Sequence, residues 1–147
     1  APVSAAKTLV LSEGRGQAGL AASEMLLHQG IATEIVTSDI AVAADLDPTN
    51  RAAWYQRLGE RDCRFTAAHV VESVNADTVV LRNVFDDRLS KREGIHLIVD
   101  WSGCRANDEL IYGWDDDAPQ IFSIGDCRAP RTVEVAISEA SALANRI

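Results

Sequence analysis

Cysteine is scarce in this sequence of 147 residues, and the little there is suits neither a metal site nor a disulfide framework. Cys63, Cys104 and Cys127 lie far apart, form no CxxC pair and are odd in number. A disulfide scaffold, an iron–sulfur cluster and a structural zinc site are therefore disfavoured. The same scarcity is typical of a reducing compartment, so we expect a cytoplasmic protein.

Positive charge and long apolar runs are also in short supply. The chain has 14 Lys and Arg against 22 Asp and Glu, a formal net charge of −8, so we expect no nucleic-acid partner. No apolar run approaches the roughly 20 residues of a membrane span. Residues 1–7 lack the charged start and apolar middle of a signal peptide. We therefore expect no membrane partner.

The length suits a single domain over residues 1–147, with two small lobes as the upper limit. Hydrophobic residues make up 47% of the chain but aromatics only 5%, so the core must be mostly aliphatic. A TIM barrel needs about 250 residues and cannot fit. An enzyme that binds both a flavin and a nicotinamide would also be larger, so in such chemistry this chain would be a fragment or a subunit.

The first part of the chain predicts a βαβ unit. Residues 7–11 form a short apolar run, and residues 33–37 form a second run rich in β-branched side chains. Between them a glycine cluster is followed by apolar residues at helical spacing over 20–27, and Gly30 is a natural helix stop. Strand, glycine turn, helix and strand together predict a parallel strand pair.

The rest of the chain predicts an α/β domain. We expect a helix over 51–61, a short strand over 63–65, and two or three segments suited to antiparallel pairing over 69–74, 78–84 and 94–99. Residues 86–92 are expected as a charged hairpin tip. A strand over 120–124 and an Ala-rich helix over 132–147 follow. The predicted fold is a Rossmann-like pyridine-nucleotide-binding domain, with a central parallel sheet, a β-meander and a final strand and helix.

The glycine cluster is the first candidate site. Gly14, Gly16 and Gly19 have the GxGxxG spacing after a strand and before a helix, where glycines let a pyrophosphate approach the helix N-terminus. An acidic residue about 20 positions further on would bind ribose hydroxyls, and Asp39 lies there. Against this, Glu13 would repel phosphate, although Arg15 could compensate. The alternative is a surface turn that binds nothing.

A second candidate is the pair Gly125 and Asp126, after an apolar run and before a helix. The carboxylate could accept hydrogen bonds from sugar or ribityl hydroxyls, but it could equally cap the helix start. The acidic run 115–117 is better read as a solvated loop than as a cation site. The histidines are isolated and Cys104 and Cys127 have no adjacent base, so we predict no metal site and assign no catalytic residue.

Several stretches resemble a known family when taken together. Residues 46–51 read LDPTNR, residues 78–84 read TVVLRNV, and residues 124–132 read IGDCRAPRT. With Trp54, Tyr55 and residues 107–110, these stretches are similar, in order, to the iron–sulfur flavoproteins of the trimethylamine dehydrogenase and 2,4-dienoyl-CoA reductase group. The resemblance runs from about Thr8 to Ile147.

The resemblance implies a piece of a larger oxidoreductase. Residues 8–118 would be its inserted NAD(P)-type lobe, and residues 119–147 the return strand and helix of its FAD-type lobe. Gly125 and Asp126 match the flavin- or ADP-side Gly-Asp of the family. FMN or FAD and an iron–sulfur cluster would belong to a partner barrel domain or subunit, and an oligomer is compatible. The stretch 101–105 departs from the family's Ala-Thr-Gly-Arg.

These observations lead to two functional expectations and a remote third. The first is a nucleotide-binding module of a flavin-dependent oxidoreductase that seats NAD(P)H or an ADP moiety. The second is a degenerate module that binds no nucleotide and serves assembly. A self-contained small reductase is the least favoured, because no catalytic acid, base or redox pair is evident.

Overall fold

The computed structural model describes residues 7–13, 16–112 and 119–147. The chain divides into two compact units, Ala1–Gly103 and Cys104–Ile147. The lobe boundary expected at residue 118 lies outside the described residues and stays a prediction.

The first unit is built on a four-stranded parallel sheet. Its strands are β1 (Lys7–Ser12), β2 (Ala32–Val36), β3 (Arg64–Thr66) and β7 (Ile95–Trp101), in the order β3-β2-β1-β7. β1 pairs in parallel with both β2 and β7, and β2 pairs in parallel with β3. The predicted βαβ opening is confirmed, and the carboxyl ends of β1, β2 and β7 lie at one edge of the sheet.

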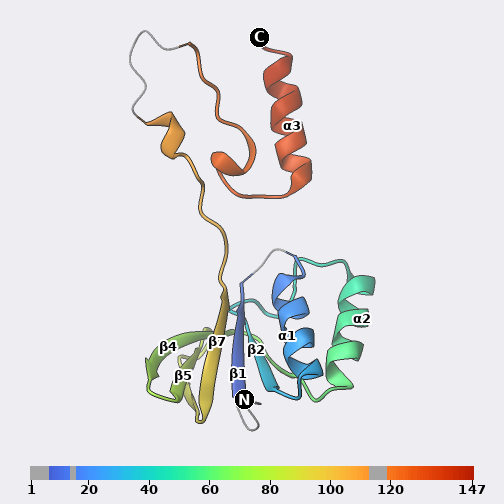
Figure 1. Cartoon of the computed structure of the whole chain (residues 1–147), viewed down its shortest axis with the longest axis vertical. Helices are drawn as coiled ribbons and strands as arrows, with labels where there is room; N and C mark the ends of the chain where they lie inside the picture. The colour runs from blue at the N-terminus through green and yellow to red at the C-terminus, as the bar shows by residue number, and fades with distance from the viewer. Residues whose placement is uncertain (1–6, 14–15, 113–118) are drawn as a thin grey trace. The chain divides into compact units, whose positions relative to one another are not determined.

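Two helices cover one face of this sheet, α1 (Ala18–His28) and α2 (Pro48–Gly59) (Figure 1). Four side chains that are fully buried between the sheet and these helices are Val10, Leu20, Ile35 and Leu58. Burying a side chain of this size stabilises the fold by about 1.5–3 kcal/mol. The core is aliphatic, as the low aromatic content predicted.

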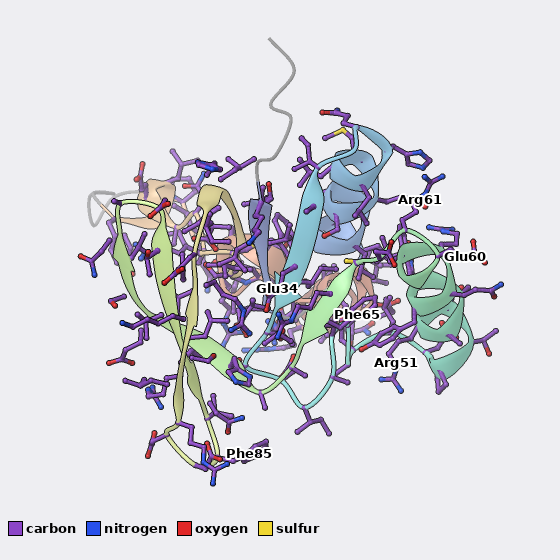
Figure 2. All side chains as sticks on the ribbon, turned by 90° about the horizontal axis from the view of Figure 1, so that it is seen from below. Glu34, Arg51, Glu60, Arg61, Phe65 and Phe85 are labelled. Atoms are coloured by element: carbon purple, nitrogen blue, oxygen red, sulfur yellow. The ribbon has the colours of Figure 1, made fainter. Side chains whose placement is uncertain are left out.

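An antiparallel meander covers the other face. It consists of β4 (His69–Asn75), β5 (Thr78–Asn83) and β6 (Leu89–Arg92). Val79 and Leu81 of β5 pack with Leu9 and Val36 of the parallel sheet. Phe85 lies at the outer tip of the β5–β6 hairpin and is 74% exposed (Figure 2).

The meander corrects one prediction. Residues 94–99, expected to pair in antiparallel fashion, contribute instead to β7, which pairs in parallel with β1. The third meander strand is the polar segment Leu89–Arg92, which we expected to belong to a hairpin tip. The sequence of residues 89–92 has no β-branched residue and so gave no strand signal. The run 95–99 did predict a strand, but an apolar run does not show whether its neighbour is parallel or antiparallel.

A buried ion pair joins the meander to the parallel sheet. The Glu34 carboxylate on β2 accepts hydrogen bonds from Arg92 Nε on β6, 2.9 Å from each oxygen. It also accepts the Thr66 hydroxyl of β3 at 2.6 Å, and Arg64 Nε lies 3.6 Å away. Glu34 is only 8% exposed. The cost of burying this carboxylate is offset by the hydrogen bonds and ion pairs that it makes with Arg92, Thr66 and Arg64.

Helix α2 begins earlier than the expected residue 51. Asp47 caps it, accepting the backbone N–H groups of Thr49 and Asn50 at 3.0 Å each. These bonds, with one from the Asn50 side chain, hold the pKa of Asp47 below its ordinary value. Pro48 stands at the first helical position, where its missing N–H costs nothing.

The second unit contains two single-turn 3-10 helices, Glu109–Ile111 and Gly125–Cys127, and the helix α3 (Val133–Ala144). None of the α3 residues is buried. Residues 120–124, expected as a strand, pair with no other strand among the described residues, although Ile124 has extended backbone angles. A strand needs a hydrogen-bonding neighbour, and the described part of this unit supplies none.

The ion pair gives a stability prediction. Replacing Arg92 by Ala leaves Glu34 buried without its main partner, so the free energy of unfolding should fall by about 3 kcal/mol. Arg88 is a matched control, because its side chain is 86% exposed and its ion pair among the described residues is a surface one with Asp86. Arg88→Ala should change stability by less than about 0.5 kcal/mol. Urea denaturation measures both, and equal small losses would show that Arg64 and Thr66 suffice for Glu34.

Candidate nucleotide site at the glycine turn

The turn between β1 and α1 has part of the backbone geometry that a dinucleotide turn requires. Gly14 lies outside the described residues. Gly16 has a φ of +88°, a conformation that favours glycine, and open space where a Cβ would stand. A Cβ on Gly19 would lie 2.6 Å from Ser12 Oγ and 2.9 Å from Ser12 Cβ. Gly19 therefore permits the close packing of α1 on β1 that the third glycine of this motif provides.

The amide of Gly16 already binds an anionic group. Its N–H donates to the Asp45 carboxylate Oδ2 at 2.7 Å, across 29 residues of sequence. A carboxylate at this amide occupies the kind of position that a phosphate oxygen takes in a nucleotide complex. The glycine turn is thus able to bind an oxyanion, and in this structure the anion comes from the chain itself.

Glu13 ties the ends of the two central strands together. One carboxylate oxygen accepts the Ser38 N–H at 2.9 Å, and the other accepts the Ser38 hydroxyl. The Glu13 N–H donates to the Trp101 carbonyl oxygen at 3.0 Å, which links β1 to the end of β7. Glu13 therefore has a structural role at this edge, and its expected repulsion of phosphate stays a prediction.

Asp39, the expected ribose ligand, lies just beyond β2. Its side chain is exposed, its N–H donates to Thr37 Oγ1 at 3.2 Å, and its carbonyl oxygen accepts the Ala68 N–H at 2.7 Å. Because Ser38 is bound to Glu13, Asp39 lies at the same sheet edge as the glycine turn. The carboxylates of Glu13, Asp39 and Asp45 give this edge a negative charge, and whether it binds a nucleotide stays a prediction.

Asp45 could not be found from the sequence. It lies in the loop after β2, which carries no recognised motif, and only the fold brings it to Gly16. Helix α2 also contacts the glycine turn, because Trp54 Nε1 of α2 donates to Gln17 Oε1 at 3.2 Å. Trp54 is thus a packing residue of the core, and it also orients the side chain that precedes α1.

Gly125 and Asp126 form a separate cluster in the second unit. Gly125 has a φ of +65° and donates its N–H to Glu139 Oε2 at 2.7 Å. This bond and the guanidinium of Arg131 hold the pKa of Glu139 below its ordinary value. Asp126 is exposed and accepts the Arg131 N–H at 3.2 Å, just before α3 begins. Its carboxylate thus orders the helix entry, and whether it also binds a ribityl or sugar hydroxyl stays a prediction.

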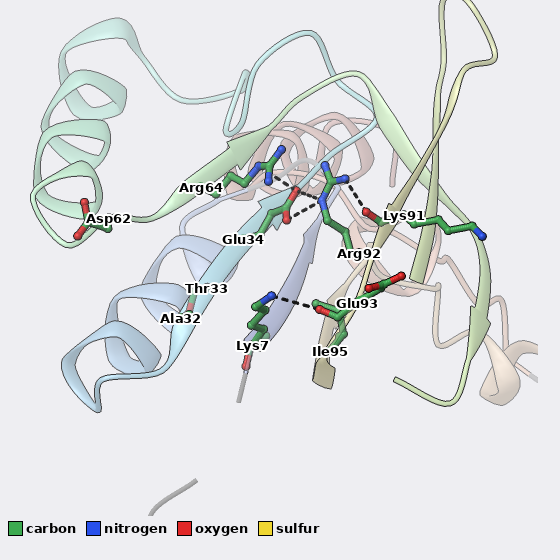
Figure 3. Close-up of a pocket in the computed structure, with 11 residues that line it drawn as sticks. Lys7, Ala32, Thr33, Glu34, Asp62, Arg64, Lys91, Arg92, Glu93 and Ile95 are labelled. Carbon is green, nitrogen blue, oxygen red and sulfur yellow. Dashed lines mark hydrogen bonds and ion pairs between the residues drawn. The ribbon is translucent and has the colours of Figure 1, made fainter. Parts of the chain in front are cut away.

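A cavity of about 510 Å³ lies at the opposite, amino end of β1 and β2 (Figure 3). Glu34, Arg64 and Arg92 line it, and their ion pairs hold the meander to the sheet. Lys7 Nζ donates to the Glu93 carbonyl oxygen across its mouth at 3.3 Å. The carboxylate of Glu34 is therefore already engaged by the two arginines, and the cavity is remote from the glycine turn.

No metal or nucleophile site emerges from the described ranges. They contain no group of three or more His, Cys, Asp and Glu side chains that could hold a metal ion, and the acidic run 115–117 falls outside them. Burial, followed by the nearby Glu34 charge, raises the pKa of Cys63 to about 11, so this thiol stays protonated at neutral pH. None of the helices within those ranges is both long enough and apolar enough to span a membrane.

Comparison with known proteins places the fold among oxidoreductases. No family model and no curated protein matches the sequence. Among solved structures, histamine dehydrogenase from Rhizobium sp. 4-9 matches 97% of this chain with a TM-score of 0.79 at 19% identity. A 2-naphthoyl-CoA reductase matches 96% with a TM-score of 0.72 at 18% identity. The 6-hydroxypseudooxynicotine amine oxidase from Pseudomonas geniculata N1 matches 92% with a TM-score of 0.73 at 14% identity.

This chain spans only 23%, 21% and 21% of those three proteins. Their names mark them as a dehydrogenase, a reductase and an oxidase. The chain therefore has the fold of one part of much larger oxidoreductases, in line with the family resemblance of its sequence.

The packing at Gly19 is open to a direct test. Gly19→Ala forces a Cβ against Ser12 and should lower the free energy of unfolding by about 1–3 kcal/mol. Gly59→Ala is the control, because Gly59 is also helical but has open space around its missing Cβ. That change should be neutral or stabilise by up to about 1 kcal/mol. Thermal unfolding distinguishes them, and a Gly19→Ala protein as stable as Gly59→Ala would refute the close-packing role.

Proposed function

We propose that this chain is the nucleotide-domain part of a flavin-dependent oxidoreductase of the amine dehydrogenase and enoate reductase kind. Its first unit would seat the ADP moiety of an adenine nucleotide, as ADP or NAD(P)H, at the turn before α1. The Gly16 amide carries this proposal, because it presents a backbone donor to an oxyanion at the carboxyl edge of a parallel sheet. The oxidoreductase fold and the sequence resemblance support it.

The electron-transfer chemistry would reside in the rest of such an enzyme. The described residues include no metal cluster, and the thiol of Cys63 is buried and protonated. FMN or FAD and an iron–sulfur cluster would be bound by a partner barrel domain or subunit. The exposed apolar residues Val133 and Ile137, one turn apart on α3, support such a neighbour.

The second unit would then belong to an FAD-type lobe. Residues 120–124 have no pairing strand among the described residues, and a sheet of the larger enzyme would supply one. Asp126 retains the oxygen Oδ2 for a ribityl or sugar hydroxyl after accepting the Arg131 amide with Oδ1. The region of residues 119–147 would complete that lobe rather than bind a flavin alone.

A second candidate function is a structural module that binds no nucleotide. Two observations favour it: Glu13 is fixed on Ser38, and Asp45 already satisfies the Gly16 amide. In this case the edge of the sheet would be internally closed, and the fold would serve only to position the flavin-bearing parts.

Titration calorimetry with ADP, NADH, NADPH and FAD distinguishes the two functions. We expect ADP or a nicotinamide dinucleotide to bind at one site, and Gly16→Ala to weaken that binding, because a Cβ at a φ of +88° strains the turn. Gly30→Ala is the matched control, since Gly30 has a φ of +76° and open space but follows the far end of α1. A cooperatively unfolding protein that binds none of the four ligands would leave only the structural role.

A further inference from the structure

The loop between β2 and α2 holds Asp45 in place firmly. Val42 and Ala43 are buried, and the Tyr55 hydroxyl of α2 donates to the Val42 carbonyl oxygen at 3.1 Å. The Leu46 N–H donates to the Ala43 carbonyl oxygen at 3.1 Å, which closes a turn around Asp45. The backbone of this loop is therefore anchored in the α1 and α2 core on both sides of the aspartate.

The Asp45 side chain differs from its loop in this respect. The residue is exposed, and within the described part of the turn its contact is one bond to the Gly16 N–H. Rotation of the side chain alone would release that amide, with no rearrangement of the buried loop. A phosphate oxygen that needs the same donor must take the place of this carboxylate and tolerate its charge nearby.

We propose that Asp45 is an autoinhibitory latch on the nucleotide site, a carboxylate that competes with the ligand's phosphate for the Gly16 amide. The inference rests on the proposed function of that site. Competition makes the site selective for groups that carry more negative charge than one carboxylate, so a diphosphate displaces Asp45 where a simple carboxylic acid does not. The apparent affinity for the ligand is the intrinsic affinity multiplied by the fraction of molecules in which Asp45 has released the Gly16 amide.

The latch is tested with two variants of the full chain. Asp45→Asn removes the charge and keeps the size of the side chain, and Asp45→Ala removes the acceptor altogether. Both should bind ADP about tenfold more tightly than the natural sequence, because a hydrogen bond to a charged group and its repulsion of phosphate are lost. Asp77→Asn is the charge-matched control, because Asp77 lies in the exposed turn between β4 and β5; its ADP affinity should be unchanged.

A second measurement tests the contact without any ligand. The Gly16 amide resonance in a ¹H–¹⁵N spectrum should move in Asp45→Asn and Asp45→Ala and stay in place in Asp77→Asn. Circular dichroism confirms that each protein is folded.

The outcomes separate the latch from the function on which it rests. ADP binding that is equal in the natural chain and both Asp45 variants overturns the latch and leaves the proposed nucleotide site standing. Folded variants that bind no ADP, like the natural chain, overturn the nucleotide site and the latch together. Tighter binding in both Asp45 variants, with Asp77→Asn unchanged, supports both.

Discussion

A parallel sheet has to be covered on both faces, and the first unit of this protein is organised by that requirement. Helices α1 and α2 cover one face and the β4–β6 meander covers the other. Apolar packing holds the helices, whereas the meander is joined by the Glu34–Arg92 pair as well as by its aliphatic side chains. The two layers in turn leave the carboxyl edge of the sheet as the place where loops from different strands can meet.

At that edge two carboxylates hold the structure together through hydrogen bonds to backbone N–H groups. Glu13 joins the end of β1 to Ser38, and Asp45 satisfies the amide of Gly16. Each carboxylate meets the hydrogen-bonding need of a backbone N–H that would otherwise require water or a phosphate. A glycine turn with a backbone N–H donor is thus combined with carboxylates at the same edge. Under the proposed function these carboxylates would oppose the phosphates of a nucleotide, and the affinity would depend on the exposed side chain of Asp45.

The two units differ in how many of their side chains are buried. The first has two apolar clusters with fully buried members such as Leu9 and Leu20. In the second, Gly125 is buried among the described residues, while α3 buries none of its side chains. An α-helix with exposed valine and isoleucine side chains is stabilised when another element covers its apolar stripe. The solved oxidoreductases with this fold are much longer, and this chain spans less than a quarter of each.

Local patterns by themselves determined much of the first unit. Apolar periodicity and β-branched runs were enough for β1, α1 and β2. They also predicted α2, although its expected start at residue 51 was three residues late, because Asp47 caps the helix and Pro48 begins it. Only the tertiary structure decided which strand β7 joins, that Arg92 pairs with Glu34 across 58 residues, and that Asp45 reaches Gly16. These contacts depend on how distant segments are brought together in space, and a charged residue in a loop has the same local sequence whether it meets water or an amide from another element.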